Sequence, residues 1–175
     1  VSIIGAGAMA LAAASYLKLK DVSSLVYVRR EKKLAAWSTK PVRVTGVMES
    51  SFYVPMAKTM KEAVNYSDTV IICTRAGDYE DVINELLPCL RKGQCILFLN
   101  GCWGAVKTYR LLKDDAKYLT IAETAGSPFV ASHSEAFLTL EMKGIRTEIG
   151  SSALGTDTEQ GEIHQPIAPS VTSHC

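Results

Sequence analysis

The sequence predicts an α/β protein of the Rossmann type, with a doubly wound, mostly parallel sheet, then a C-terminal hairpin and the start of a truncated second domain. The first observation is a glycine fingerprint, Gly5-Ala6-Gly7-Ala8-Met9-Ala10, between a short apolar run and a helical pattern. The second is the alternation of apolar, strand-like runs with helical patterns, which is typical of parallel strands joined by crossover helices. The third is an apolar fraction of 47%, which is enough for a sizeable core.

The first half of the chain contains short apolar runs that end in glycine or in charged residues, as buried parallel strands do. Between them lie stretches whose apolar residues recur at helical spacing. The expected elements, in order, are a strand at 1–4, a helix at 9–20, a strand at 25–28, a short helix at 31–37, two short strands at 42–44 and 52–54 around a turn at Gly46, a short helix at 58–65 and a strand at 69–73.

The clearest helix covers residues 79–90, where apolar side chains recur at positions i, i+3, i+4 and i+7. Pro88 lies inside this stripe, so we expect the last turn to be kinked or the helix to have ended before it. A strand at 95–99, a helix at 106–112 and a strand at 119–122 follow.

The pattern changes after the last of these strands. Residues 136–140 and 146–149 are strand-like, and Lys143-Gly144 between them predicts the turn of a hairpin. The tail is rich in small polar residues and contains prolines. We therefore divide the chain into an NADP-binding Rossmann domain at 1–150 and, at 151–175, a linker or the truncated start of a helical substrate domain.

The glycine fingerprint has the features of a phosphate-binding turn. Gly5 permits a sharp turn out of the first strand, Gly7 lets the backbone approach a pyrophosphate, and Ala10 is small enough for close helix packing. Ala8 and Met9, at the start of the helix, are expected to donate N–H groups to the anion. The alternative is a tight turn that serves packing alone.

The end of the second strand predicts which dinucleotide is bound. NAD-binding sites place an acidic residue there for the ribose hydroxyls, whereas this sequence has Arg29 and Arg30, with Lys33 one helical turn later. A guanidinium can pair bidentately with the 2′-phosphate of NADP. We therefore predict NADP(H) as the cofactor, with NAD(H) less favoured. The alternative is a solvated, basic start of the next helix.

Three further strand ends carry polar residues, and ligands of doubly wound sheets bind beyond the carboxyl ends of the strands. Thr74 and Arg75 follow one strand, Asn100 and Gly101 follow the next, and Glu123 ends the last. We expect the first four to contact the cofactor, and Glu123 is a weaker candidate. The alternative for each of these residues is that it only stabilises the turn after its strand. The sequence identifies no catalytic residue.

Charge and cysteine usage argue against other classes of protein. A net charge of +1 does not supply the basic face that nucleic-acid binding needs, and no apolar run is long enough to suggest a membrane partner. The five cysteines form no CxxC pair, which indicates free thiols, no metal site and a reducing, cytoplasmic compartment.

The fingerprint and the segments VIICTRAGDYEDVINELLPCL, ILFLNGCWGA and TIAETAGSPFVAS resemble the opine dehydrogenases over about residues 1–150, and in spacing especially the opine-metallophore branch typified by staphylopine dehydrogenase. The resemblance implies a two-domain enzyme that uses NAD(P)H to reduce the imine formed between an amino acid or amine and a 2-oxo acid. It implies a catalytic histidine paired with an acid in the second domain, and often a homodimer. The cofactor contacts that it implies are Gly5, Gly7, Arg29, Thr74 and Asn100.

Two alternatives stay open beside this resemblance. The Asn-Gly pair after a strand also resembles ketopantoate reductase, whose product is a hydroxy acid. The third alternative is a dinucleotide-sensing module without chemistry. A need for added amine during NADPH oxidation with a 2-oxo acid separates the first two, and binding without turnover in the full-length protein indicates the third. The present chain is itself expected to bind cofactor and to turn over poorly.

Overall fold

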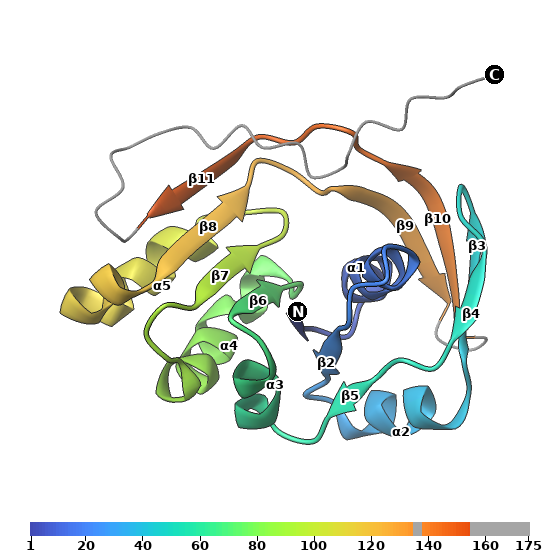
Figure 1. Cartoon of the computed structure of the whole chain (residues 1–175), viewed down its shortest axis with the longest axis horizontal. Helices are drawn as coiled ribbons and strands as arrows, with labels where there is room; N and C mark the ends of the chain where they lie inside the picture. Colours follow the sequence, from blue (N-terminus) through green and yellow to red (C-terminus); the bar gives the residue numbers. More distant parts are fainter. Residues whose placement is uncertain (135–137, 155–175) are drawn as a thin grey trace.

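The computed structural model describes residues 1–134 and 138–154, which form two sheets with helices around them (Figure 1). The larger sheet has seven strands in the order β11-β8-β7-β6-β1-β2-β5, and all neighbours are parallel except β11 and β8. This order, with the chain winding outward from β1 in both directions, confirms the predicted doubly wound sheet. Its strands are β1 (Ser2–Ile4), β2 (Leu25–Tyr27), β5 (Met56–Ala57), β6 (Thr69–Ile72), β7 (Cys95–Phe98), β8 (Thr120–Thr124) and β11 (Ser151–Leu154).

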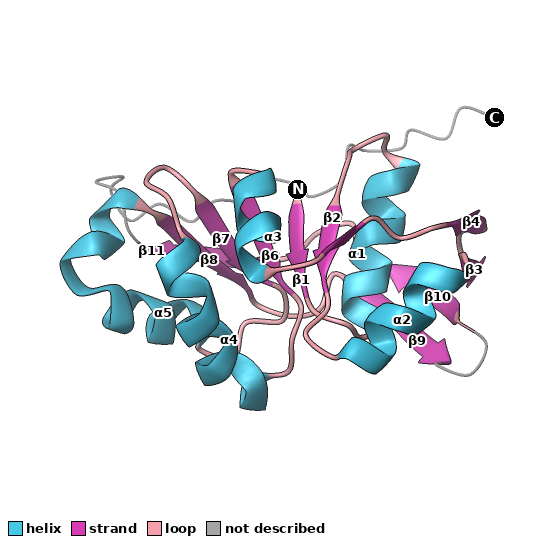
Figure 2. Cartoon of the chain, turned by 90° about the horizontal axis from the view of Figure 1, so that it is seen from below, coloured by secondary structure: helices cyan, strands magenta, loops and turns pink. Residues whose placement is uncertain are grey.

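Helices cover both faces of this sheet (Figure 2). They are α1 (Ala8–Leu19), α2 (Glu31–Thr39), α3 (Met60–Tyr66), α4 (Tyr79–Leu86) and α5 (Gly104–Leu112), with short 3-10 turns η1 (Ala76–Asp78), η2 (Leu87–Cys89) and η3 (Lys113–Tyr118). Successive side chains of a strand point to opposite faces, so Ile3 packs into the core beneath α1 while Ile4 packs into the core beneath α3 and α4. The predicted end of the fourth helix is confirmed, because α4 stops at Leu86 and Pro88 lies in η2.

The second sheet has four strands in the order β4-β3-β10-β9. These are β3 (Val42–Gly46), β4 (Ser50–Phe52), β9 (Phe129–Ser134) and β10 (Thr139–Ile145). Helix α1 lies between the two sheets (Figure 1), and residues Ala10 to Ala14 within it are all buried. Alanine side chains are small, so both sheets can approach the same helix closely.

The predicted hairpin around Lys143-Gly144 is wrong. Both residues lie inside β10, which pairs antiparallel with the preceding strand β9 and parallel with β3. The register shifts between Met142 and Gly144, so the glycine belongs to a bulge and not to a turn. Residues 146–149 form no strand, and residues 136–137 of the other predicted strand lie outside the described residues. By contrast, the two short strands predicted at 42–44 and 52–54 exist as the antiparallel pair β3 and β4, but β4 begins two residues earlier than predicted, at Ser50, and Gly46 is the last residue of β3, so the turn follows it.

The main sheet extends past the domain boundary that we placed after residue 150. Strand β11 pairs with β8 from Ser151 opposite Thr124 to Leu154 opposite Ile121. The beginning of the expected linker is therefore an edge strand of the Rossmann sheet. Residues 155–175 lie outside the described residues.

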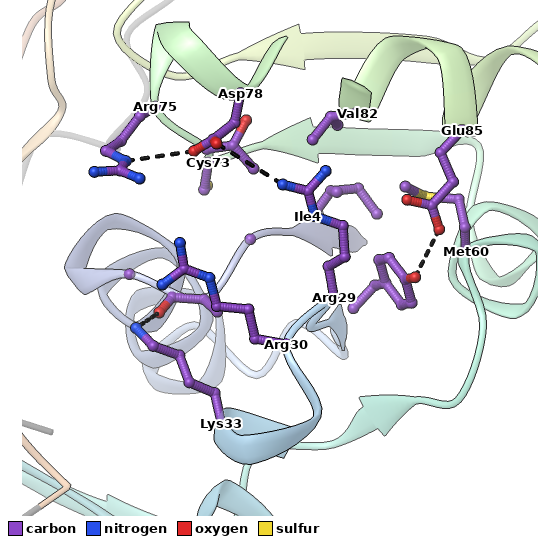
Figure 3. A pocket seen from close by; sticks show the side chains of 15 residues that line it. Ile4, Arg29, Arg30, Lys33, Met60, Cys73, Arg75, Asp78, Val82 and Glu85 are labelled. Carbon is purple, nitrogen blue, oxygen red and sulfur yellow. Dashed lines mark hydrogen bonds and ion pairs between the residues drawn. The ribbon is translucent and has the colours of Figure 1, made fainter. Parts of the chain in front are cut away.

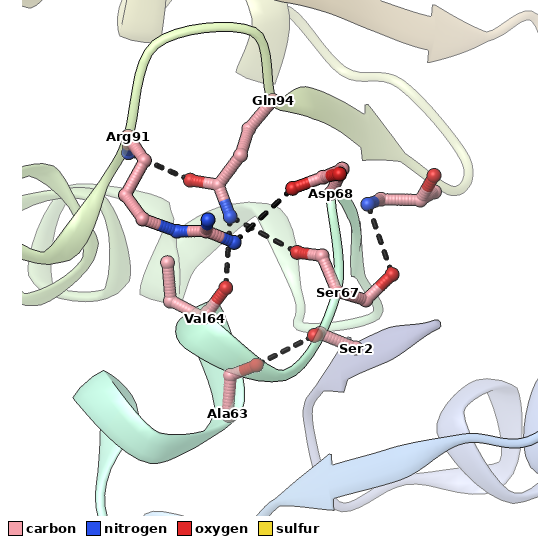
Figure 4. A network of polar contacts seen from close by, with 8 residues as sticks. Ser2, Ala63, Val64, Ser67, Asp68, Arg91 and Gln94 are labelled. Atoms are coloured by element: carbon pink, nitrogen blue, oxygen red, sulfur yellow. Dashed lines mark hydrogen bonds and ion pairs between the residues drawn. The ribbon is translucent and has the colours of Figure 1, made fainter.

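A buried amide fixes the edge of the sheet that is opposite to the carboxyl ends of the strands (Figure 4). Gln94 is fully buried, and its Nε2 donates hydrogen bonds to the carbonyl oxygens of Val64 and Ser67 at 2.8 and 3.0 Å. Its Oε1 accepts a hydrogen bond from the Arg91 N–H at 2.7 Å. Carbonyl groups at the end of a helix have no partner within the helix. Gln94 therefore supplies a donor to Val64 in the last turn of α3, and the Ser2 hydroxyl donates to Ala63 in the same turn at 2.6 Å. None of the helices within residues 1–134 and 138–154 has the length and apolar character that a membrane span requires.

Candidate functional site

The turn from β1 into α1 requires glycine at position 5. Gly5 has a φ of +145°, and a Cβ there would lie 2.8 Å from the carbonyl oxygen of Cys73, the residue after β6. The Gly5 N–H also donates a hydrogen bond to the carbonyl oxygen of Tyr27 at 3.0 Å, so the turn is held between β2 and β6. Any residue with a side chain at this position would clash with the backbone and would have to adopt a φ that only glycine tolerates.

Gly7 has a different environment. It caps α1 with an ordinary φ of −113° and no side-chain cap, and a Cβ built on it would meet nothing within 4 Å. The backbone here is therefore open to close approach by a ligand. The N–H groups of Ala8 and Met9 lie in the first turn of the helix, where N–H groups have no acceptor within the helix and favour an anion.

A cavity of about 330 Å³ opens beside this turn, at the carboxyl ends of β1, β2 and β6 (Figure 3). It brings together most of the predicted cofactor residues, which lie far apart in the sequence. The residues that line it are Ile4, Gly5, Ala6, Gly7, Tyr27, Arg29, Arg30, Lys33, Met60, Cys73, Thr74, Arg75, Asp78, Val82 and Glu85.

One wall of the cavity is basic. Arg29, Arg30 and Lys33 extend from the end of β2 and the start of α2 along this wall (Figure 3). Lys33 Nζ donates a hydrogen bond to the carbonyl oxygen of Ala6 at 3.0 Å, so its charge is held against the glycine turn. Within the described part of the chain, the guanidinium of Arg30 has no hydrogen-bond or ion-pair partner. Three cations close to a helix N-terminus make this wall suitable for phosphate groups.

The opposite wall carries an acid that the sequence analysis missed. Asp78 Oδ1 lies 3.8 Å from Arg29 Nη2, and its Oδ2 lies 3.3 Å from Arg75 Nε. Arg29 Nη1 also lies 3.4 Å from Oδ2 of Asp81, which lies in the first turn of α4. No spacing rule pointed to Asp78, because it lies in η1 and meets Arg29 only through the packing of β6 beside β1.

Thr74 lines this cavity, and its hydroxyl is buried with no hydrogen-bond partner among the described residues. A buried hydroxyl without a partner costs about 1–3 kcal/mol, so a polar ligand atom at this position would stabilise it. This orphaned hydroxyl, the open backbone at Gly7 and the basic wall all fit a dinucleotide.

The floor of the cavity is mostly apolar, with Ile4, Met60 and Val82 on three different elements. Tyr27 completes it, and its hydroxyl donates a hydrogen bond of 2.6 Å to Glu85 Oε1. Burial, assisted by this carboxylate, raises the pKa of Tyr27 to about 12, so the phenol is neutral at ordinary pH. An apolar surface with polar groups at its edge suits a heterocyclic base.

Asn100 and Gly101 do not line this cavity. They lie on the same edge of the sheet, after β7, which is parallel to β6. The Asn100 N–H donates to Thr124 Oγ1 at 2.8 Å, and the Tyr79 hydroxyl donates to the Gly101 carbonyl oxygen at 2.9 Å. Glu123 Oε2 accepts from a backbone N–H at the start of α5 at 3.1 Å, so this candidate carboxylate supports the loop.

This loop adopts a backbone that side chains rarely tolerate. The values of φ from residue 100 to residue 103 are +69°, +27°, +59° and +67°. Left-handed backbone persists only where surrounding contacts hold it, and it clusters at binding and catalytic sites. Trp103 ends the loop with 71% of its surface exposed, so it is available to a ligand and is not part of the core.

The comparisons with known proteins agree with this architecture. A family model described as ketopantoate reductase PanE/ApbA matches residues 1–121. The comparison with curated proteins gave no match.

Solved structures share the fold at low sequence identity. An octopine dehydrogenase in complex with NADH and agmatine has a TM-score of 0.75 and 15% identity, over 91% of this chain and 43% of that one. A PanE/ApbA family ketopantoate reductase from Ralstonia eutropha JMP134 has a TM-score of 0.66 and 20% identity, over 84% and 47%. A yersinopine dehydrogenase with NADP+ bound has a TM-score of 0.63 and 18% identity, over 86% and 40%. The chain thus spans less than half the length of each of these structures.

Proposed function

The chain belongs to the ketopantoate reductase PanE/ApbA family, and from this premise we propose that it is the NADP(H)-binding part of a reductase acting on a 2-oxo acid or on the imine that a 2-oxo acid forms with an amine. The observation that carries the proposal is the cavity beside the glycine turn, which combines open backbone at Gly7, a basic wall and the orphaned hydroxyl of Thr74.

The residues of this chain would divide the cofactor between them. The backbone at Gly7 and the N–H groups of Ala8 and Met9 would hold the pyrophosphate, because they combine close approach with the positive end of a helix. Arg29 and Arg30 would hold the 2′-phosphate of NADP(H) at the end of β2.

The ribose and nicotinamide would extend toward the loop at residues 100–103, whose φ values are all positive. Thr74 lines the same cavity as the glycine turn, and its buried hydroxyl would bond a ribose or phosphate oxygen. Arg75, the next residue, also lines the cavity. Asn100 and Gly101 follow the neighbouring strand β7 and would contact the nicotinamide end of the cofactor. NADPH, when bound, supplies the hydride.

The reaction that we propose first is of the opine type. An amine and a 2-oxo acid condense to an imine with loss of water, the imine carbon accepts hydride, the nitrogen accepts a proton, and a secondary amine and NADP+ result. Support comes from the segments quoted above and from the fold of octopine dehydrogenase, which has the higher TM-score of the three structures. The opine-metallophore branch is the finer form of this proposal.

The second candidate is reduction of the ketone itself, favoured by the family model. Amine dependence separates the two. In the full-length protein, NADPH oxidation with a 2-oxo acid that needs an added amino acid supports imine reduction, and oxidation at the same rate without amine supports ketone reduction. NADPH binding with no turnover under either condition would contradict both.

Cofactor choice is tested on the present chain. The variant Arg29→Asp places an acid at the end of β2, so we expect the ratio of NADPH to NADH affinity, measured by nucleotide fluorescence, to fall by about tenfold or more. The surface variant Arg110→Asp is the control, since Arg110 lies on α5 and outside the cavity. An unchanged ratio in Arg29→Asp would refute the assignment of NADP(H).

A further inference from the structure

Asp78 lies between two arginines on the wall of the cavity. Its two carboxylate oxygens lie 3.8 Å from Arg29 Nη2 and 3.3 Å from Arg75 Nε. Figure 3 shows the carboxylate between the two guanidinium groups, one from the end of β2 and one from the segment after β6. The residue assigned to the 2′-phosphate is therefore already paired with an acid in this structure.

We propose that Asp78 sets the cofactor selectivity of this site, because its carboxylate competes with the 2′-phosphate of NADP(H) for Arg29 and offers an acceptor to the ribose hydroxyls of NAD(H). The inference rests on the proposed cofactor site and concerns which nucleotide that site prefers. In NAD-binding sites the acid that binds the ribose hydroxyls usually lies at the end of the second strand. Here we assign that contact to Asp78, which lies after β6.

Burial distinguishes Asp78 from the second acid near Arg29. The side chain of Asp78 is 29% exposed, whereas that of Asp81 is 74% exposed. Water and salt screen an exposed pair strongly, so the closer contact of Asp81 with Arg29, at 3.4 Å, carries less weight. Asp78 also lines the cavity and Asp81 does not.

Charge determines the direction of the effect. A 2′-phosphate brings about two negative charges at neutral pH, so it is repelled by Asp78 and must also displace that carboxylate from Arg29. Arg75 remains beside Asp78 when Arg29 turns to the phosphate, which makes the exchange possible without leaving the acid unpaired. NAD(H) carries hydroxyls at this place, which can donate hydrogen bonds to the carboxylate.

The test compares the variant Asp78→Asn with Asp81→Asn in the present chain, using nucleotide fluorescence to measure dissociation constants for NADPH and NADH. Both variants remove one negative charge close to Arg29 with little change of shape. Asp78→Asn is expected to tighten NADPH binding about five- to tenfold and to weaken NADH binding about twofold or more, whereas Asp81→Asn should change either by less than about twofold. The gain for NADPH should shrink as salt is raised.

Several outcomes would overturn the inference while leaving the proposed function standing. These are an unchanged NADPH to NADH ratio in Asp78→Asn, or an equal shift in Asp81→Asn, which would indicate general surface charge and no special role for Asp78. If the unaltered chain binds neither nucleotide, the proposed function itself fails. Thermal melting checks the fold of each variant, and Asp78→Ser repeats the measurement if Asp78→Asn melts early.

Discussion

Gly5 and Gly7 make the same turn, yet substitution by alanine should damage the protein in different ways. At Gly5 the new Cβ would lie 2.8 Å from the Cys73 carbonyl oxygen, and the φ of +145° is one that alanine rarely adopts. The backbone conformation and the overpacking each cost about 1–3 kcal/mol, so Gly5→Ala should lose about 2–6 kcal/mol of stability. For a chain of this size that corresponds to a fall in melting temperature of about 5–20 °C.

Gly7→Ala is the matched control for stability and the test for binding. Its Cβ would meet nothing within 4 Å and its φ of −113° is ordinary, so stability should change by about 1 kcal/mol or less. The methyl group would occupy the space where a pyrophosphate approaches the backbone, so NADPH should bind about tenfold or more weakly. Urea unfolding followed by circular dichroism measures the first effect and fluorescence titration the second.

Two results would refute this division of roles. One is a melting temperature of Gly5→Ala within about 2 °C of the original chain, since a clash of the predicted size must lower it further. The other is normal NADPH affinity in a folded Gly7→Ala chain, which would show that the open space beside Gly7 is not where the phosphate lies.

Three further predictions follow from buried polar groups. Gln94→Leu removes the donor to the carbonyl oxygens of Val64 and Ser67, so urea unfolding should show a loss of stability of about 2–4 kcal/mol. The control Asp68→Ala removes only an exposed ion pair and should cost less than about 1 kcal/mol. Equal losses in the two variants would contradict a structural role for the buried amide. Thr74→Val removes a hydroxyl without a partner among the described residues, so stability should hold or rise while the Kd for NADPH rises about fivefold; a large loss of stability would reveal a structural role instead. The pKa of Tyr27 is raised from 10.0 to about 12, so the folded state holds this proton more tightly than the unfolded state. The stability that it contributes is complete below pH 10 and is lost as the pH rises toward about 12. Tyr27→Phe should therefore lose less stability between pH 10 and about 12 than the unaltered chain does. An ultraviolet titration of the unaltered chain should show a tyrosine that ionises near pH 12 and is missing in Tyr27→Phe, and its persistence in the variant would contradict the assignment.

The strands of the main sheet were predictable from the sequence because each is a short apolar run next to a turn signal. The strands predicted at 1–4, 25–28, 69–73, 95–99 and 119–122 are confirmed as the parallel strands β1, β2, β6, β7 and β8. The glycine turn was predictable for a similar reason, since the demands on Gly5 and Gly7 come from a few neighbouring residues.

The second sheet was not predictable in the same way. β10 pairs with β3, almost a hundred residues earlier, from Thr139 to Met142. Its other neighbour, β9, keeps the chain extended beyond Lys143, because Gly144 and Ile145 pair with Val130 and Phe129. Read locally, the same two residues are a turn signal. β11 lies at the edge of the main sheet because β8 offers it an open side, and its own composition resembles a linker.

The candidate site shows the same limit. Arg29 and Thr74 could be placed from the sequence, because each follows directly from the end of a strand and the ends of parallel strands share one edge. Asp78 could not, because it lies in η1, and its carboxylate meets Arg29 only where the packed sheet brings the segment after β6 close to the end of β2.

The sequence by itself determined the fold class, the glycine turn between β1 and α1 and the basic end of β2, because periodicity, glycine spacing and strand ends are local properties of the chain. Only the tertiary structure decided that Arg29 lies between Asp78 and Asp81, that the Thr74 hydroxyl is buried without a partner among the described residues, and that Asn100 and Gly101 stand apart from the cavity. The physical reason is that charge pairing and burial depend on distances between elements, and those distances exist only after the sheets and helices have packed.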